Sequence, residues 1–142
     1  MGVTIASNVN SFPGVYAIWN KCNGKIYIGS SKNIKNRALN HLGKLKKKAH
    51  PITDMQNDFN SGDEMVIFNV LKVNNVKNLR YYEREAITSF KSIENGYNCQ
   101  SVSSKESVEL NKIRILSGTI DYFHNGADQQ ERNLIYNKII HD

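Results

Sequence analysis

Hydrophobic and polar positions in the first half of the chain predict a hairpin followed by a third strand. The run Val15–Trp19 is apolar, aromatic and β-branched, which is typical of a strand. Asn23-Gly24 is a preferred pair for a tight hairpin turn, so residues 25–30 are expected to return as a second strand. Residues 65–73 alternate and predict the third strand. The polar residues 1–11 are expected to form a loose lead-in.

Apolar residues spaced three and four apart predict helices between and after these strands. The first helix covers residues 34–47 and is capped by Ser31 or Asn33. A short helix follows over residues 53–60, and a third over residues 78–90 turns an apolar stripe inward. That stripe consists of Leu79, Tyr82, Ala86, Ile87 and Phe90.

Two further amphipathic helices are predicted near the C-terminus. They cover residues 105–123 and 128–141 and meet at an Asn125-Gly126 turn. The whole pattern predicts an α/β fold with a small three-stranded antiparallel sheet flanked by helices. It divides the chain into a domain at residues 1–100 and a C-terminal helical extension at residues 101–142.

Charge is distributed unevenly along the 142 residues. The chain carries nine Lys or Arg and no acidic residue up to Thr53, whereas from Asp54 onward it carries ten basic and thirteen acidic residues. A basic half attached to a near-neutral body is the electrostatic pattern of a protein that binds a polyanion. We therefore expect a nucleic acid as partner, in preference to a solvated basic surface without a partner.

Other bulk properties exclude several protein classes. No apolar run approaches the roughly 20 residues of a membrane span, and the N-terminus lacks the pattern of a secretory signal. Cys22 and Cys99 cannot form a metal site alone and are expected to be reduced thiols without a special role. These features indicate a cytoplasmic protein that has no membrane partner.

Two triplets in the hairpin carry the strongest functional signal. Gly14-Val15-Tyr16 opens the first strand, and Tyr27-Ile28-Gly29 lies in the second. Further polar residues follow along the chain in the order Arg37, His41, His50, Glu85 and Asn98. Together they resemble the GIY-YIG nuclease superfamily over about residues 12–100, with Val in place of Ile in the first triplet. The resemblance is closest to the catalytic domains of phage and intron-encoded homing endonucleases.

The resemblance implies a site that hydrolyses a phosphodiester. This reaction needs a nucleophilic water, charge stabilisation at phosphorus and help for the leaving oxygen. Tyr16 is then the candidate general base and Tyr27 helps to orient the water, while the guanidinium of Arg37 suits the scissile phosphate. His41, one helical turn beyond Arg37, is expected to accept a proton from Tyr16 or to orient it.

One carboxylate and two supporting residues complete the expected site. Glu85 is expected to hold the metal ion, because Mg²⁺ takes one or two carboxylates together with waters and phosphate oxygens. Mn²⁺ is an alternative ion. Glu83, two residues away, points to a different face of the helix and is expected to be a solvated residue. His50 is expected near the phosphate or the leaving group, and Asn98 is expected to tie the last loop to the site.

Six lysines extend the expected nucleic-acid surface. They have no base-specific geometry and should contact the phosphate backbone, which makes binding salt-dependent. Trp19 is expected to lie in the core and not to stack on a base. The lysines are Lys32, Lys35, Lys44, Lys46, Lys47 and Lys48.

These features predict a metal-dependent DNA endonuclease that nicks one strand per encounter, since one site holds one nucleophile and one metal ion. We expect a monomer or a homodimer, and the C-terminal helices are expected to pack on the core, contact DNA or dimerise. An association with a phage or a mobile element is also expected. The alternatives are a restriction- or repair-type GIY-YIG nuclease that makes double-strand cuts as a dimer, a non-catalytic DNA-binding module, and a structural protein with a coincidental basic face.

Overall fold

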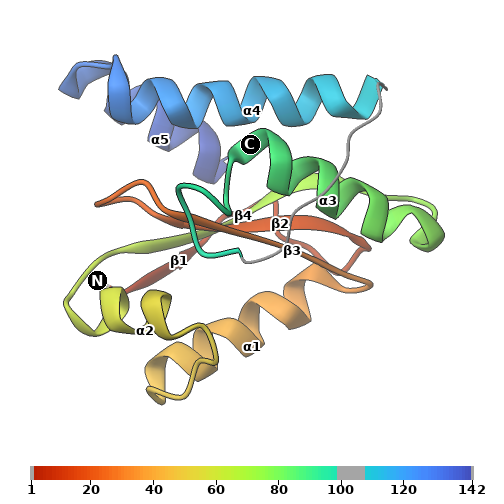
Figure 1. Cartoon of the computed structure of the whole chain (residues 1–142), viewed down its shortest axis with the longest axis horizontal. Helices are drawn as coiled ribbons and strands as arrows, with labels where there is room; N and C mark the ends of the chain where they lie inside the picture. The colour runs from red at the N-terminus through yellow and green to blue at the C-terminus, as the bar shows by residue number, and fades with distance from the viewer. Residues whose placement is uncertain (1, 99–107, 142) are drawn as a thin grey trace.

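The fold is α/β, with helices on both faces of one small sheet (Figure 1). The computed structural model describes residues 2–98 and 108–141, and the side chains of residues 108–110 also lie outside the description. The sheet has the strand order β1-β4-β2-β3. Its strands are β1 (Val3–Ile5), β2 (Gly14–Asn20), β3 (Ile26–Ser31) and β4 (Met65–Lys72).

The sheet has one strand more than the sequence predicted. The expected antiparallel unit is present as β3-β2-β4, but a fourth strand, β1, pairs with β4 in parallel, which makes the sheet mixed. The expectation of a loose lead-in at residues 1–11 is therefore wrong. Val3, Thr4 and Ile5 are all β-branched and fit a pleated strand, and they pair with Met65–Ile67.

The helices form two layers. Helices α1 (Ile34–Lys46) and α2 (Thr53–Asn60) lie on one side of the sheet, and the remaining helices lie on the other side (Figure 1). Asn33 caps α1, because its side chain accepts a hydrogen bond from the main chain of Asn36. The second group consists of the 3₁₀ turn η1 (Val76–Asn78), α3 (Leu79–Phe90), α4 (Val108–Asn125) and α5 (Gln129–His141).

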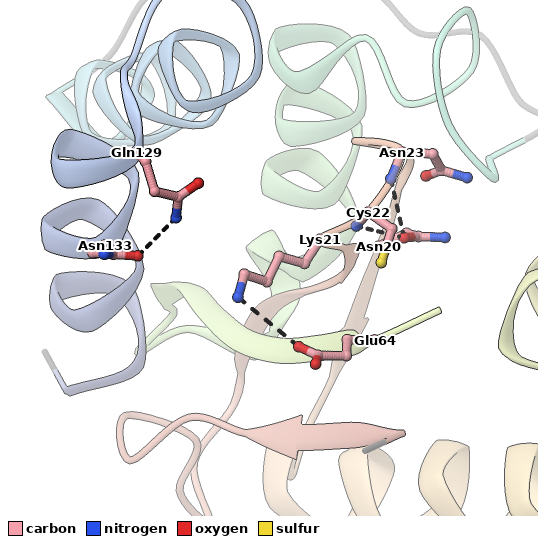
Figure 2. Close-up of polar contacts among 7 residues, drawn as sticks. All are labelled: Asn20, Lys21, Cys22, Asn23, Glu64, Gln129 and Asn133. Atoms are coloured by element: carbon pink, nitrogen blue, oxygen red, sulfur yellow. Dashed lines mark hydrogen bonds and ion pairs between the residues drawn. The ribbon is translucent and has the colours of Figure 1, made fainter. Parts of the chain in front are cut away.

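The turn between β2 and β3 is held by side chains as well as by its sequence. The side-chain oxygen of Asn20 accepts hydrogen bonds from the main chain of Cys22 at 2.9 Å and of Asn23 at 3.2 Å (Figure 2). An ion pair of 3.9 Å between Lys21 and Glu64 links the turn to the segment before β4 (Figure 2). Cys22 is an exposed free thiol, whereas Cys99 lies outside the described residues.

The C-terminal helices share the core of the sheet. Trp19 is fully buried, as predicted, and its ring meets Phe123 of α4 edge-on at 5.0 Å between centroids. Its Nε1–H donates to Nε2 of His124 at 3.0 Å. The division of the chain at residue 100 stays a prediction, and the expected start of α4 at residue 105 lies outside the described residues. Within the described ranges, no helix combines the length and the apolar character that crossing a membrane requires.

Candidate active site

The two motif tyrosines lie on one face of the sheet. Tyr16 pairs with Gly29 and Ile18 pairs with Tyr27 across β2 and β3, so strand alternation places both tyrosines on the same side. Their ring centroids are 6.4 Å apart. The pairing of β2 with β4 is interrupted by a bulge between Val15 and Tyr16, a device that re-aims side chains beside functional sites.

The glycine of the second triplet leaves space for the first tyrosine. A Cβ atom at Gly29 would lie 2.5 Å from Oη and 2.6 Å from Cζ of Tyr16. The Tyr16 ring therefore crosses the strand β3 directly above Gly29. Glycine is needed at the first triplet for a different contact, because a Cβ at Gly14 would lie 2.4 Å from the main-chain oxygen of Leu71. Each motif glycine thus permits one close approach.

A chain of hydrogen bonds runs from Tyr16 into the loop after α1. Oη of Tyr16 lies 2.7 Å from Nε2 of His41, and Nδ1 of His41 lies 2.8 Å from Nε2 of His50. The two imidazole rings stack at 5.0 Å with an interplanar angle of 20°. His50 is only 7% exposed. The structure therefore brings Tyr16, His41 and His50 together through direct contacts.

Cationic side chains of α1 line a pocket beside the hydrogen-bonded residues Tyr16, His41 and His50. A pocket of about 410 Å³ lies between α1 and the loop that precedes α2. Arg37, His41 and Lys44 follow one another at spacings of four and three, so they project from one face of α1 into this pocket. The other lining residues are Tyr27, Asn40, His50, Pro51 and Ile52. Such a pocket suits an anion such as a phosphodiester.

The surroundings of Tyr16 and His41 hold both groups neutral in the free protein. Burial raises the pKa of the Tyr16 phenol, the phenol of Tyr27 and the carboxylate of Glu83 raise it further, and the charge and hydrogen bonding of Arg37 lower it. Burial also lowers the pKa of His41 to about 3, and His50 and the two cations of the pocket act in the same direction. Tyr16 therefore needs additional positive charge before it can act as a base near neutral pH.

The two glutamates of α3 lie on different faces of that helix. Glu83 stands four residues after Leu79 and four before Ile87, on the side that packs against the sheet. It accepts a hydrogen bond from Oγ of Ser30 on β3, and its charge raises the pKa of Tyr16. Glu83 therefore reaches the site from the edge strand, although the sequence pointed to Glu85.

Glu85 occupies the side of α3 that faces α4. Ser89, one turn further along the same side, lies 2.9 Å from Oγ of Ser117 on α4. The Glu85 side chain is only 3% exposed, and its charge is not among the groups that shift the pKa of Tyr16. The role predicted for Glu85 as metal ligand stays a prediction.

Asn98 joins the Gly-Tyr-Asn turn to the edge strand β3. Its side-chain oxygen accepts from the main-chain N–H of Ile28 at 2.7 Å, and its amide donates to the Ile28 carbonyl at 2.9 Å. The amide thus pairs with β3 as a neighbouring strand would. Gly96 permits this approach, because a Cβ there would lie 2.3 Å from the carbonyl oxygen of Ile26.

The six lysines expected to contact DNA are all exposed. Lys44 lies in the pocket beside Arg37 and lowers the pKa of both His41 and His50. Lys46 and Lys47 lie at the C-terminal end of α1, where cations complement the helix dipole. The others are Lys32, Lys35 and Lys48.

One residue that supports the site had no signal of its own in the sequence. Gln56 of α2 is 7% exposed and accepts a hydrogen bond from the main-chain N–H of His50 at 3.0 Å. Its amide donates to the carbonyl of Leu45 at the end of α1. In the sequence, Gln56 looks like any exposed polar residue of a short helix. Its contact with the loop becomes visible only in the tertiary structure.

Comparison with known proteins agrees with this geometry. The GIY-YIG catalytic domain family matches residues 12–98. The chain belongs to the GIY-YIG endonuclease family. The match covers both triplets, α1, α3 and the Gly-Tyr-Asn turn, and it confirms the family that the sequence resembled.

One curated relative and two solved structures illustrate the likeness. The chain is 32% identical over 103 residues to intron-associated endonuclease 1 of enterobacteria phage T4, which covers 71% of this chain and 42% of that protein. The catalytic domain of the homing endonuclease I-TevI superimposes with a TM-score of 0.58 at 27% identity, covering 63% of this chain and 99% of that domain. A glutamate-to-alanine variant of that domain gives a TM-score of 0.57 at 26% identity, covering 66% and 98%. The chain therefore spans less than half the length of the T4 endonuclease.

Proposed function

We propose that this chain is a metal-dependent endonuclease that hydrolyses phosphodiester bonds of DNA. The observation that carries the proposal is the position of the buried Tyr16 hydroxyl, 2.7 Å from His41 and within the fields of Arg37 and Glu83. A hydroxyl placed among a histidine, a guanidinium and a carboxylate is suited to take a proton from an attacking water. Family membership and the basic N-terminal half of the chain support a nuclease that acts on DNA.

Arg37 is the proposed ligand of the scissile phosphate. It lies in the pocket with Lys44 and is close enough to lower the pKa of Tyr16. A guanidinium stays charged at all relevant pH values and can hold two phosphate oxygens at once. A phosphate bound there would place its phosphorus beside the Tyr16 hydroxyl, so Tyr16 is the proposed general base and Tyr27 is proposed to orient the water.

Glu83 is the residue that we propose to hold the metal ion. Within the described residues, no group of three or more His, Cys, Asp and Glu side chains could hold an ion by itself. A single carboxylate at the edge of the site suits Mg²⁺ or Mn²⁺, which complete their shells with waters and phosphate oxygens. Such an ion supplies positive charge that lowers the pKa of nearby water and hydroxyl groups.

A plasmid assay with matched glutamate variants tests the proposal. Supercoiled plasmid is incubated with Mg²⁺ and with wild-type protein, Glu83→Gln or Glu85→Gln, because both substitutions remove a charge at constant size. We expect open-circular product with the wild type and none with EDTA. Glu83→Gln should lower the rate by about a hundredfold or more, whereas Glu85→Gln should cleave at a rate close to that of the wild type.

Each other outcome has a definite meaning. If Glu85→Gln is inactive and Glu83→Gln cleaves, Glu85 is the metal ligand, as the sequence predicted. If the wild type binds DNA but yields no product with Mg²⁺ or Mn²⁺ at low salt, the chain is a DNA-binding module. If EDTA has no effect, the metal dependence is wrong.

The product also reports strand use. One site per chain predicts a nick, so open-circular DNA should accumulate without linear DNA. Linear product that rises with the square of protein concentration would instead indicate a dimer that cuts both strands. An association with a mobile element, which the similarity to the T4 intron-associated endonuclease supports, predicts that cleavage is confined to few sites.

A further inference from the structure

A series of hydrogen bonds links the loop between α1 and α2 to Tyr16, and the donor of each bond follows from the donor at its start. This series of hydrogen bonds starts at the main-chain N–H of Ile52, passes through His50 and His41, and ends at Tyr16. We propose that this amide sets the tautomer of both histidines, so that His41 donates a proton to the oxygen of Tyr16 and His50 is a positioning residue. The inference rests on the role proposed for Tyr16.

The direction follows from the one donor that cannot change its role. The N–H of Ile52 points at Nδ1 of His50 across 3.1 Å, so this nitrogen must accept. In a neutral imidazole the proton then lies on Nε2, which faces Nδ1 of His41 at 2.8 Å. Nδ1 of His41 therefore accepts, and its own proton lies on Nε2, 2.7 Å from Oη of Tyr16.

The opposite order would bring two hydrogens together. If His41 accepted a proton from Tyr16 at Nε2, its own proton would lie on Nδ1 and face His50. His50 would then carry its proton on Nδ1, directly against the N–H of Ile52. A main-chain amide cannot become an acceptor, so this arrangement loses a hydrogen bond and adds a repulsion in a buried position.

The argument requires both histidines to be neutral, and their surroundings ensure this. Burial lowers the pKa of His41 and of His50, and the charge of Lys44 lowers both further. Arg37 acts on His41 in the same way. Neither ring therefore carries two protons near neutral pH, and each has one donor and one acceptor.

The loop that carries the amide is held in place from two sides. Gln56 accepts a hydrogen bond from the main-chain N–H of His50 and donates to the carbonyl of Leu45. The main-chain N–H of Gln56 donates in turn to the carbonyl of Ile52 at 3.0 Å. The Ile52 amide is therefore fixed relative to both α1 and α2, so it can hold His50 in one orientation.

The consequence concerns the path of the tyrosine proton. His41 cannot receive this proton, because its facing nitrogen already bears one. The phenol of Tyr16 must therefore pass its proton to a water that enters the site, and not to His41. The phenolate, which keeps the N–H of His41 as a donor, then takes a proton from the attacking water as the water oxygen bonds to phosphorus and the leaving oxygen departs. Of the two roles expected for His41, this arrangement favours orientation over proton acceptance.

Imidazole NMR tests the proposal without DNA or metal, so its result is independent of cleavage. The ¹⁵N-labelled full chain is examined at pH 7 by two-bond ¹H–¹⁵N correlation, and the signals are assigned with His41→Gln and His50→Gln. We expect a neutral ring with the proton on Nε2 for both histidines. A proton on Nδ1 of either ring, or a doubly protonated ring, would overturn the proposal.

A pair of variants at Ile52 separates the amide from the side chain. Proline suits the φ of −84° at this position and keeps the carbonyl that Gln56 uses, but it removes the N–H. Ile52→Pro should give mixed tautomers and a nicking rate about tenfold below that of Ile52→Ala, which should keep the wild-type tautomers. His50→Gln should cleave faster than His50→Ala, because its amide N–H can replace Nε2–H. Unchanged tautomers in Ile52→Pro would refute the role of the amide.

Discussion

Substitution of Gly29 by alanine should move the hydroxyl of Tyr16, the proposed general base, while the protein stays folded. The added Cβ would lie 2.5 Å from Oη of Tyr16, whereas ordinary contacts begin at 3.4 Å. The hydroxyl must therefore move by about 0.9 Å, the difference between these two distances. Tyr16 is 1% exposed, so the ring moves against a packed surface, and such overpacking costs about 1–3 kcal/mol.

The effect on cleavage should exceed the effect on stability. A shift of this size can stretch the 2.7 Å hydrogen bond between Tyr16 and His41 beyond the usual range, and a misplacement of about 1 Å lowers rates by about a hundredfold. We therefore expect Gly29→Ala to remain folded at 25 °C and to nick supercoiled plasmid about a hundredfold more slowly in single-turnover assays.

Gly43→Ala is the matched control on the neighbouring helix α1. A Cβ at Gly43 has no atom within 4 Å, so alanine should stabilise the helix by up to about 1 kcal/mol and leave cleavage unchanged. Urea unfolding at pH 7 supplies the stability of both variants. If Gly29→Ala cleaves at the wild-type rate while it is fully folded, the Tyr16 hydroxyl does not need its present position, and the assignment of Tyr16 as general base is refuted.

Two further predictions concern pH and the edge strand. The pKa of His41 is lowered to about 3 in the folded protein. As the pH falls below 6.5, the unfolded chain therefore binds a proton at His41 that the folded protein does not bind. The free energy of unfolding should then fall by about 1.4 kcal/mol per pH unit toward pH 3. Urea midpoints at pH 7 and pH 5 measure this, and the fall should be smaller in His41→Gln; an equal fall in both would contradict the assignment. Asn98→Ala leaves the N–H and the carbonyl of Ile28 without their partner and should cost about 1–3 kcal/mol, whereas a stability equal to the wild type would mean that water replaces the amide at no cost.

Local patterns in the sequence predicted those elements whose partners lie nearby in the chain. The hairpin from Gly14 to Ser31 depends on β-branched runs and a turn pair, and its register follows from the turn and places both tyrosines on the same face. Helices α1 and α2 were predicted to within a residue of their observed bounds. Strand β1 was not predicted, because three β-branched residues in a polar segment form a strand only when they pair with β4, 62 residues later in the chain.

The two glutamates of α3 show what the order of residues reports and what depends on side-chain direction. Two residues apart on a helix, Glu83 and Glu85 were correctly placed on different faces. Glu83 continues the apolar stripe of Leu79 and Ile87 at a spacing of four, and this periodicity was a usable signal for the side that meets the sheet. The order of polar residues along the chain favoured Glu85, and this order does not report the direction of a side chain.

The sequence by itself determined the family, the hairpin, the basic N-terminal half and the residue types available for catalysis, because these depend only on the order of residues along the chain. The tertiary structure alone decided that β1 joins the sheet, that Glu83 reaches Ser30, and that the Ile52 amide meets His50. Each of these contacts joins segments that pack together only when the core forms. Their geometry depends on the balance of packing over the whole domain, which no local pattern records.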